Sequence, residues 1–573
     1  MQKPALVALA SLCCLAAFPA VSAYAGKTSV SDAHRFTKQI ANNDKILQAL
    51  NRLTFGPRPG DADQVRSMGL KKWIDLQLHP ERIAENPTLE QKLQTLDTLS
   101  MTSEQLVRNY PTPQIVKQMV AGQMPFPADP DRRMLIEKLV AKAERKQGEG
   151  AQPPADAPEA QALRDLLSRD EIRALRTGTP QQRLAAFLSL SMDKQADVIG
   201  ALPQGVRQAL FQIAPPELRR RIELANGPQQ VVARDLVESK VLRAVYSNRQ
   251  LAEVLADFWY NHFNVFLDKG ADRYLVTQYE REAIRPHVLG KFRDLLEATA
   301  TSPAMLFYLD NWQSVGPNAP QPRGTGNKTR RGLNENYGRE LMELHTLGVD
   351  GGYTQKDVTE VARCFTGWTI NQPQRGGKFV FNPRLHDNGE KVVLGVTIPA
   401  GGGKEDGEKV LDILSRHPST AHFISKELAQ RFVADEPPAA LVDRMAQTFL
   451  KNDGDIREVM RTMLASREFW STDAYRSKMK SPLEMVASAV RAVNGNVDFA
   501  FPLANQVAQL GEPLYRKIEP TGYSNSSKEW VNSAGLLARM NFAVQLSTDK
   551  MPGVKIETAK AAADLGSPDF QKH

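Results

Sequence analysis

This 573-residue sequence contains little cysteine and little excess of either charge. Three cysteines are too few for a disulfide scaffold, and a chain of this length buries enough apolar surface to fold without one. Lys and Arg number 73 against 65 Asp and Glu, which is not the concentrated basic footprint of a nucleic-acid-binding protein. We therefore predict a globular protein with no nucleic-acid partner.

The familiar sequence signatures of catalysis are also missing. There is no HExxH or CxxC pair, no phosphate-binding P-loop, no GxSxG nucleophile elbow and no GxGxxG turn opening a βαβ unit. Acyl transfer at a serine elbow and dinucleotide chemistry are therefore disfavoured. Any reaction has to be inferred from polar residues that form no standard motif.

The one long apolar run lies at the N-terminus. Lys3 precedes a nearly continuous apolar stretch from Ala5 to Phe18, and small residues follow at 21–25. This order is typical of a secretory signal peptide, which we assign to residues 1–25. The alternative is an uncleaved membrane anchor, because the run approaches the ~20 residues that a span requires. We favour cleavage and expect an exported protein, periplasmic or extracellular, with no stable membrane span afterwards.

Cleavage would remove Cys13 and Cys14 and leave Cys364 as the remaining thiol, so no intramolecular disulfide is expected. Cys364 stands among apolar and aromatic residues in the sequence ARCFTGW. This setting favours a buried, inert thiol over a reactive nucleophile.

The rest of the chain predicts a mainly α fold: a large helical domain with one small β-hairpin and an inserted helical subdomain. The hairpin is expected near 379–398, where residues alternate in hydrophobicity around a turn at Asp387-Asn388-Gly389. The predicted divisions are an N-terminal helical part of the main domain (26–142), a flexible linker rich in Gly, Pro and charge (143–160), the inserted subdomain (161–225), the remainder of the main domain (226–545) and a C-terminal tail (546–573).

His262 is the first candidate for chemistry. It lies on the apolar face of a helical pattern over 251–266, with Asn261 adjacent and Asp257 one turn before Asn261. A buried imidazole beside amide and carboxylate groups can act as an acid, a base or a ligand. The alternative, which is commoner for a lone histidine, is a core residue hydrogen-bonded to a backbone carbonyl.

A second candidate is the helix predicted around NYGRELMELH. Glu340 and Glu343 share one face with Arg339, Tyr337 lies on the adjoining apolar strip, and His345 lies beyond it. Two carboxylates one turn apart can divide into a proton donor and an acceptor, or can hold a divalent cation. The alternative is a solvated face with ion pairs between successive turns.

Two weaker candidates complete the set. His386 and Asp387 are possible binding residues, although Asn388-Gly389 explains the turn without any function. A basic loop around 323–331 is either a binding loop, for example for anionic polysaccharide, or a disordered surface loop without a function. Our predicted catalytic residues are His262, Glu340 and Glu343, and the predicted binding residues are Asn261, Tyr337, Arg339, His345, His386 and Asp387.

Four segments resemble a known family. They are LNRLTFGPRPGD (50–61), DFWYNHFNVF (257–266), NENYGRELMELHTLGVDGGYTQKDVTEVARCFTGW (334–368) and GYSNSSKEWVNSAGLLARMNFA (522–543). Together they are similar to the bacterial domain-of-unknown-function family 1800. The resemblance implies an exported protein, commonly encoded beside a second exported protein that resembles sulfatases and alkaline phosphatases. It assigns no catalytic residue, because none is established for the family.

Two functions follow as hypotheses. The first is an exported enzyme that uses acid–base or metal-assisted chemistry at a site uniting His262 with Glu340 and Glu343. The second is a non-catalytic helical partner or maturation factor for the neighbouring sulfatase- or phosphatase-like protein. The cofactor, if any, and the substrate are not indicated by the sequence.

Overall fold

The computed structural model describes residues 35–148, 163–317, 319, 332–556 and 565–573. The predicted signal peptide and the basic loop at 323–331 lie outside these ranges. No helix within them is long and apolar enough to cross a membrane.

The predicted mainly α fold is confirmed, and α15 shows how sequence and packing agree. Leu251, Val254, Leu255, Phe258 and Trp259 recur at helical spacing, and all are buried in the main hydrophobic core. The helix ends at His262, where the amide of Phe263 donates to the carbonyl of Trp259. The bounds of the helices in the main body are α1 Asn42–Leu53, α2 Asp61–Met68, α3 Leu70–Gln77, α4 Pro87–Gln94, α5 Ser103–Asn109, α6 Pro113–Val120, α7 Pro130–Gly148, α14 Pro228–Tyr246, α15 Gln250–His262, α16 Asp272–Tyr279, α17 Phe292–Ala300, α18 Pro303–Tyr308, α19 Asn336–Glu343, α20 Gln355–Cys364, α21 Glu405–Ser415, α22 Pro418–Phe432, α23 Ala439–Lys451, α24 Ile456–Ala465, α25 Pro482–Ala492, α26 Phe501–Gln509 and α27 Ser533–Ser547.

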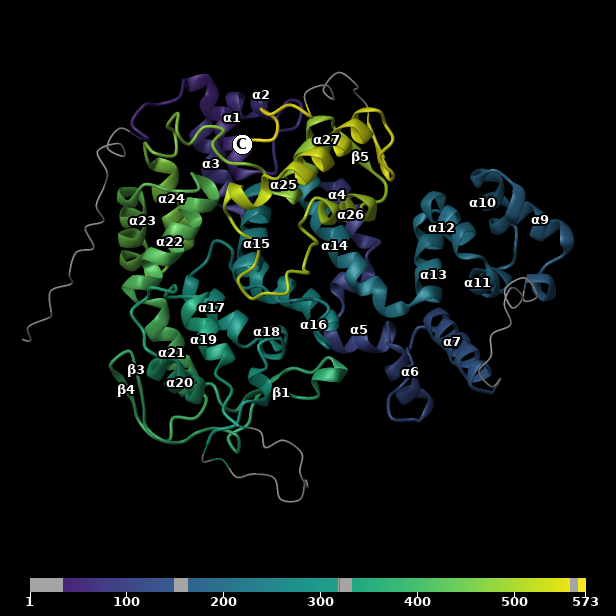
Figure 1. The fold of residues 1–573 in the computed structure, drawn as a ribbon, viewed down its shortest axis with the longest axis horizontal. Helices are drawn as coiled ribbons and strands as arrows, with labels where there is room; N and C mark the ends of the chain where they lie inside the picture. The colour runs from purple at the N-terminus through teal and green to yellow at the C-terminus, as the bar shows by residue number, and fades with distance from the viewer. Residues whose placement is uncertain (1–34, 149–162, 318, 320–331, 557–564) are drawn as a thin grey trace, which may run out of the picture.

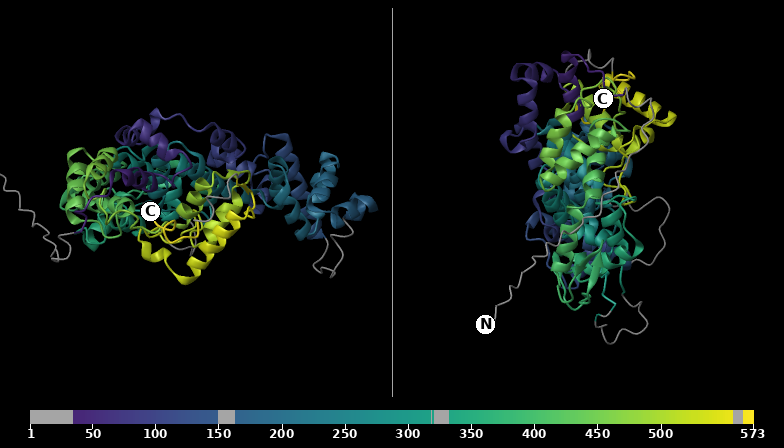
Figure 2. Two further views of the ribbon diagram at one scale, coloured as in Figure 1. Left: turned by 90° about the horizontal axis from the view of Figure 1, so that it is seen from above. Right: turned by 90° about the vertical axis from the view of Figure 1, so that its left-hand side faces the viewer.

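Between α7 and α14 the chain forms a separate group of short helices that projects from one side of the body (Figures 1 and 2). They are α9 Arg169–Thr177, α10 Pro180–Leu188, α11 Met192–Ala201, α12 Gln204–Ile213 and α13 Pro216–Asn226. Ser168 and Thr179 begin α9 and α10 with full capping boxes, and Pro180 and Pro216 occupy first helical positions. This group has its own hydrophobic core, which includes Phe187 and Leu210.

The linker predicted at 143–160 begins too early. Helix α7 continues to Gly148, so the first residues of that stretch are helical, and 149–160 lie outside the described residues. The charged side chains of this segment gave it a linker-like composition, but Lys, Glu, Gln and Ala are all good helix formers.

The β structure near 379–398 consists of two short antiparallel pairs in place of the single predicted hairpin. Strand β1 (Trp368–Ile370) pairs with β2 (Phe379–Phe381), and β3 (Lys391–Val393) pairs with β4 (Val396–Ile398). The turn of the second pair is Leu394-Gly395, where both residues have positive φ, as a two-residue hairpin turn requires. The predicted turn at Asp387-Asn388-Gly389 is wrong: Asp387 instead accepts a hydrogen bond from the amide of Gly389 within a loop.

The C-terminal tail predicted at 546–573 is partly structured. Strand β6 (Val554–Lys555) pairs with β5 (Asn496–Val497), and the last residues return to the core beside the segment that precedes α25. There the amide of His573 donates to the carbonyl of Lys478 (2.9 Å), and the amide of Lys480 donates to the carbonyl of Gln571 (3.0 Å). Leu565 is fully buried, so an apolar contact anchors this return.

Candidate functional site

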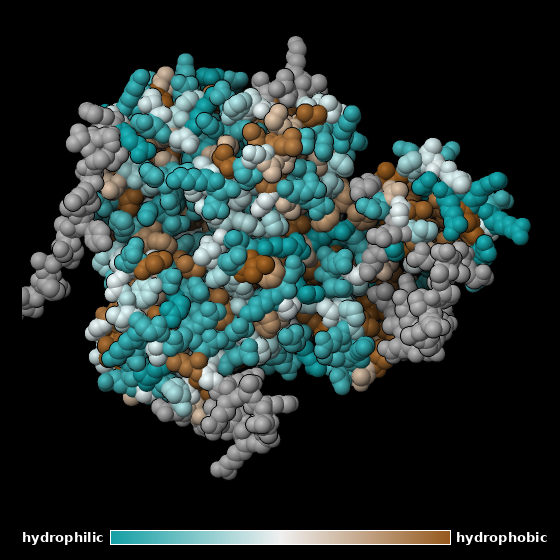
Figure 3. Space-filling model, in the orientation of Figure 1, coloured by the Kyte–Doolittle hydropathy of each residue, from teal (hydrophilic) through white to brown (hydrophobic). Residues whose placement is uncertain are grey.

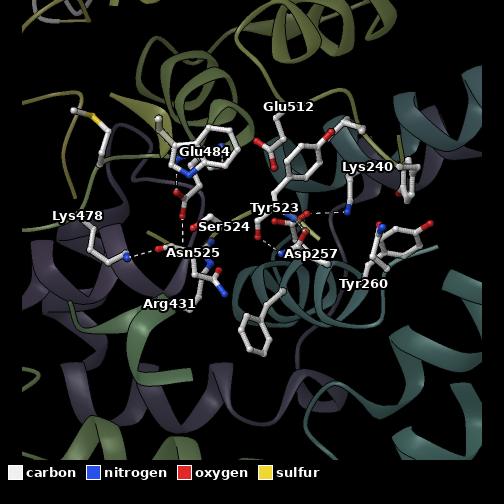
Figure 4. Close-up of a pocket in the computed structure, with 18 residues that line it drawn as sticks. Lys240, Asp257, Tyr260, Arg431, Lys478, Glu484, Glu512, Tyr523, Ser524 and Asn525 are labelled. Atoms are coloured by element: carbon white, nitrogen blue, oxygen red, sulfur yellow. Dashed lines mark hydrogen bonds and ion pairs between the residues drawn. The ribbon is translucent and has the colours of Figure 1, made fainter. Parts of the chain in front are cut away.

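A cavity lined by many charged residues lies between α14, α15, α22 and α25 and the segment 512–530 (Figure 4); we call it the charged cavity. Water-sized molecules can occupy about 60 Å³ of it, enough for several waters or for one small polar molecule that displaces them. Its walls are formed by Lys240, Asp257, Phe258, Tyr260, Asn261, Asn264, Arg431, Lys478, Met479, Ser481, Glu484, Glu512, Leu514, Tyr515, Tyr523, Ser524, Asn525 and Trp530.

One end of the charged cavity holds two carboxyl groups and a lysine. Lys240 Nζ lies 2.8 Å from Asp257 Oδ1, and this ammonium group also stands 4.7 Å from the centre of the Tyr515 ring. Glu512 is buried, and burial together with the nearby Asp257 carboxylate raises its pKa to about 8. One oxygen of Glu512 accepts the amide of Leu483 at 2.8 Å. This end therefore combines a carboxyl group whose pKa is raised by burial with a second carboxyl group that is ion-paired to a lysine.

The other end holds a buried ion pair. Arg431 Nη1 lies 2.6 Å from Glu484 Oε1, and both side chains are less than a tenth exposed. Although burial opposes ionisation, the Arg431 guanidinium holds the pKa of Glu484 down to about 2. Beside this pair, Lys478 Nζ contacts Asp435 Oδ1 (2.6 Å) and the carbonyl of Asn525 (2.7 Å), and burial lowers the pKa of Lys478 to about 8.

Asn261 in α15 and Asn264 just after it hold the segment 517–523 against the charged cavity. The side chain of Asn261 pairs with the backbone of Tyr523 in both directions: its Nδ2 donates to the carbonyl (2.7 Å) and its Oδ1 accepts from the amide (2.6 Å). Asn264 Nδ2 donates to the carbonyls of Lys517 and Glu519, both at 2.9 Å. The predicted binding residue Asn261 thus uses its amide to position a loop.

His262 lines a second cavity of about 250 Å³, which we call the histidine cavity. The two cavities share Asn261, Tyr523, Ser524 and Asn525 and therefore adjoin. Glu427 of α22 also lines the histidine cavity; burial raises its pKa, and its Oε2 accepts a hydrogen bond from Asn525 Nδ2 at 3.2 Å.

The ring of His262 has a defined hydrogen-bonding state. Its Nε2 lies 3.1 Å from the carbonyl oxygen of His345. A carbonyl only accepts, so Nε2 carries the hydrogen and Nδ1 keeps its lone pair. Burial lowers the pKa of His262 to about 4, so the ring is neutral at physiological pH. This is the carbonyl-bonded geometry of a core histidine, with the addition that the residue borders a cavity.

The other predicted catalytic residues are placed differently. Glu340 and Glu343 are half-buried on α19 and line neither cavity. Burial, with a contribution from Glu343, raises the pKa of Glu340, while Glu343 accepts a hydrogen bond from the Tyr353 hydroxyl at 3.2 Å. The link to His262 runs through the backbone, because the amide of His345 donates to the carbonyl of Glu340 at 3.0 Å.

Three predicted binding residues on and after α19 make contacts within the fold. Tyr337 is buried edge-on against Phe365. Arg339 Nη2 donates to Gln355 Oε1 at 2.8 Å. His345 is buried, its ring centre lies 6.3 Å from that of His262, and burial lowers its pKa to about 3.

His386 and Asp387 belong to a buried polar network in another part of the body. The Nδ1 of His386 lies 2.8 Å from the carbonyl of Thr366, and its Nε2 lies 3.0 Å from Asp406 Oδ2, which Lys391 Nζ also contacts at 2.6 Å. Asp387 Oδ2 accepts from Arg363 Nε at 2.7 Å. These bonds tie the loop before β3 to α20 and α21.

Cys364 is buried as predicted, and burial raises the pKa of its thiol to about 12. Among the described residues, no group of three or more His, Cys, Asp and Glu side chains is arranged to hold a metal ion.

Sequence reasoning missed most of the charged cavity. Asp257 entered only as a neighbour of His262. Lys240 could have been selected from the sequence, because a lysine within a helix that is buried on nearly every face, as α14 is, needs a buried partner. Arg431, Glu484 and Glu512 come from distant parts of the chain, and nothing in the residues around them marks them.

Comparison with known proteins supplies a family. The family model described as "Protein of unknown function (DUF1800)" matches residues 48–568. No curated protein and no solved structure matches the chain. Because the match spans nearly the whole sequence, as the four quoted segments led us to expect, the chain belongs to the DUF1800 family.

Proposed function

We propose that this protein is an exported enzyme, periplasmic or extracellular, that performs acid–base chemistry on a small polar substrate in the charged cavity. The observation that supports this most is the pair formed by Glu512 and Asp257. Burial raises the pKa of Glu512, whereas Asp257 is ion-paired with Lys240, so the two neighbouring carboxyl groups lie in different electrostatic environments. Enzymes that combine a general acid with a general base use such pairs.

The roles of the surrounding groups follow from their contacts. Glu512 would donate a proton to the substrate, and Asp257 would accept one or stabilise developing positive charge. Lys240 would hold the carboxyl group of Asp257 in place through their ion pair. His262, neutral and with Nδ1 unprotonated, would accept a hydrogen bond from a substrate group that reaches the histidine cavity.

We expect the substitutions Glu512→Gln and Asp257→Asn to abolish activity. The purified chain, incubated with an envelope extract of its native host, should deplete particular small molecules detectable by mass spectrometry. Loss of the proton donor should slow their depletion at least about 100-fold. The wild-type rate should also fall as pH rises through about 8, because Glu512 then loses its proton.

Two further variants separate this site from the one predicted on α19. Glu340→Gln and Glu343→Gln should retain far more activity than Glu512→Gln, because their carboxyl groups line neither cavity. Depletion at the wild-type rate by Glu512→Gln, or its loss in Glu340→Gln alone, would contradict the proposal.

One surface feature favours the second function, that of a partner for the neighbouring sulfatase- or phosphatase-like protein. Helix α27 exposes a stripe of apolar side chains, and Figure 3 shows the hydrophobic patch over it. The stripe consists of Leu536, Leu537, Met540 and Val544, with Val531 just before the helix. Contiguous exposed apolar side chains of this kind often mark a protein–protein interface.

The partner function is tested by recovering tagged protein from the native host. We expect the neighbouring protein to be recovered with the wild type and to be lost with Leu537→Ser/Val544→Ser. Val349→Ser, at an exposed apolar residue in a turn away from α27, is the matched control. Recovery of the tagged chain alone would count against a stable partner.

A further inference from the structure

Two aromatic rings lie side by side among the residues that line the charged cavity. The ring centres of Tyr523 and Trp530 are 6.0 Å apart, and both residues are half-buried. Tyr523 is held in place by its backbone pairing with Asn261 and by a hydrogen bond from its hydroxyl to the carbonyl of Pro513 (2.9 Å). Ser524, which also lines the cavity, is exposed, so this side is the one that meets solvent.

The charges inside the cavity occur as pairs. Lys240 is matched by Asp257, Arg431 by Glu484, and Lys478 by Asp435. A charged ligand would have to compete with one member of a pair and leave the other uncompensated in a buried site, which is costly. A hydroxyl group avoids this conflict, because it donates to the carboxylate and accepts from the cation at the same time.

Aromatic rings and paired charges together suit a polyhydroxylated ring. The face of an aromatic ring is electron-rich, and the C–H bonds on one face of a pyranose carry partial positive charge, so the two surfaces stack. The hydroxyl groups at the rim of the sugar then meet fixed donors and acceptors, here including the carboxyl of Glu512. The space available, enough for several waters, admits the hydroxyl groups of such a ring in place of those waters.

We infer that the substrate of the charged cavity is a carbohydrate, one uncharged sugar unit of which stacks on Tyr523 and Trp530 while its hydroxyl groups bind the Lys240–Asp257 and Arg431–Glu484 pairs. This inference rests on the proposed function for the identity of the site, and it adds the chemical class of the substrate.

Binding measured on Glu512→Gln protein tests the inference without turnover. The probes for isothermal titration calorimetry are D-glucose, D-galactose and N-acetyl-D-glucosamine, with L-alanine as a zwitterion and D-glucuronate as an anion. We expect saturable binding of at least one of the three uncharged sugars. Its affinity should fall at least about tenfold in Trp530→Ala and in Tyr523→Leu, and Trp530→Phe should retain it. Trp470→Phe, at a tryptophan that lines neither cavity, should leave it unchanged.

The outcomes separate this inference from the proposed function. No binding of any of the three sugars, equal binding to Trp530→Ala, or binding of L-alanine in their place would overturn the inference. Sugar binding that depends on Trp530, without turnover by the wild type, would leave the inference standing and refute the enzyme proposal. Turnover of a non-carbohydrate by the wild type but not by Glu512→Gln would support the enzyme proposal and overturn the carbohydrate inference.

Discussion

Replacing Arg431 by Met should lower the free energy of unfolding by about 3–5 kcal/mol, because it leaves the Glu484 carboxylate buried without its cation. The two groups lie 2.6 Å apart, and neither is more than a tenth exposed. Urea denaturation followed by circular dichroism measures the effect. The same variant should disrupt the charged cavity, because both residues form its wall.

Two comparisons make this result specific. Arg133→Met removes an exposed pair with Glu137 and should change stability by less than about 0.5 kcal/mol. Arg431→Met/Glu484→Gln should recover part of the loss, because no unpaired charge remains buried. A loss below 1 kcal/mol in Arg431→Met would mean that water or another cation compensates Glu484.

The free energy of unfolding should also depend on pH through the Arg431–Glu484 pair. The pKa of Glu484 is about 2 in the fold, against its ordinary value of 4.5. Its contribution is therefore fully present above pH 4.5 and is lost as pH falls from 4.5 through about 2. Wild-type protein should lose more stability over this range than Arg431→Met/Glu484→Gln does.

Gly522→Ala is the second substitution with a large expected effect. Gly522 has φ +68°, and an added Cβ would lie 2.2 Å from the carbonyl oxygen of Asn261, so the backbone would have to move. That movement would break the two hydrogen bonds between Asn261 and Tyr523. We expect a loss of about 1–3 kcal/mol for these two bonds, in addition to the strain of positive φ. Activity should fall with it, because the 521–526 segment separates the two cavities.

Gly401→Ala is the matched control for that experiment. Gly401 has φ +86°, and nothing lies within 4 Å of an added Cβ, so this substitution reports the positive-φ strain alone. Equal losses of stability in the two variants would show that the contact between Gly522 and α15 is not close enough to matter.

The fold was largely predictable because local signals dominate a helical protein. The α15 pattern and the capping boxes that begin α9 and α10 each act within a few residues. The strand pairing was not predictable in detail. The Asp-Asn-Gly turn signal competed with Leu394-Gly395, and Leu is an unusual residue at positive φ.

The candidate site was only partly predictable for a different reason. His262 could be selected because a histidine on an apolar helical face is a local pattern, and it does border a cavity. The pairing of Asp257 with Lys240, or of Arg431 with Glu484, is set by how distant helices pack. Glu340 and Glu343 formed a convincing local pattern, but neither residue lines either of the two cavities.

The protonation state of Glu512 is the most direct test of the proposed chemistry. Infrared difference spectra between the wild type and Glu512→Gln isolate this one carboxyl group from other buried acids. At pH 7 the wild type should show the carbonyl stretch of a protonated carboxylic acid that the variant lacks, and this band should disappear as pH rises through about 8. A carboxylate band at pH 6 and below, with no protonated band at pH 7, would contradict the assignment of Glu512 as the proton donor.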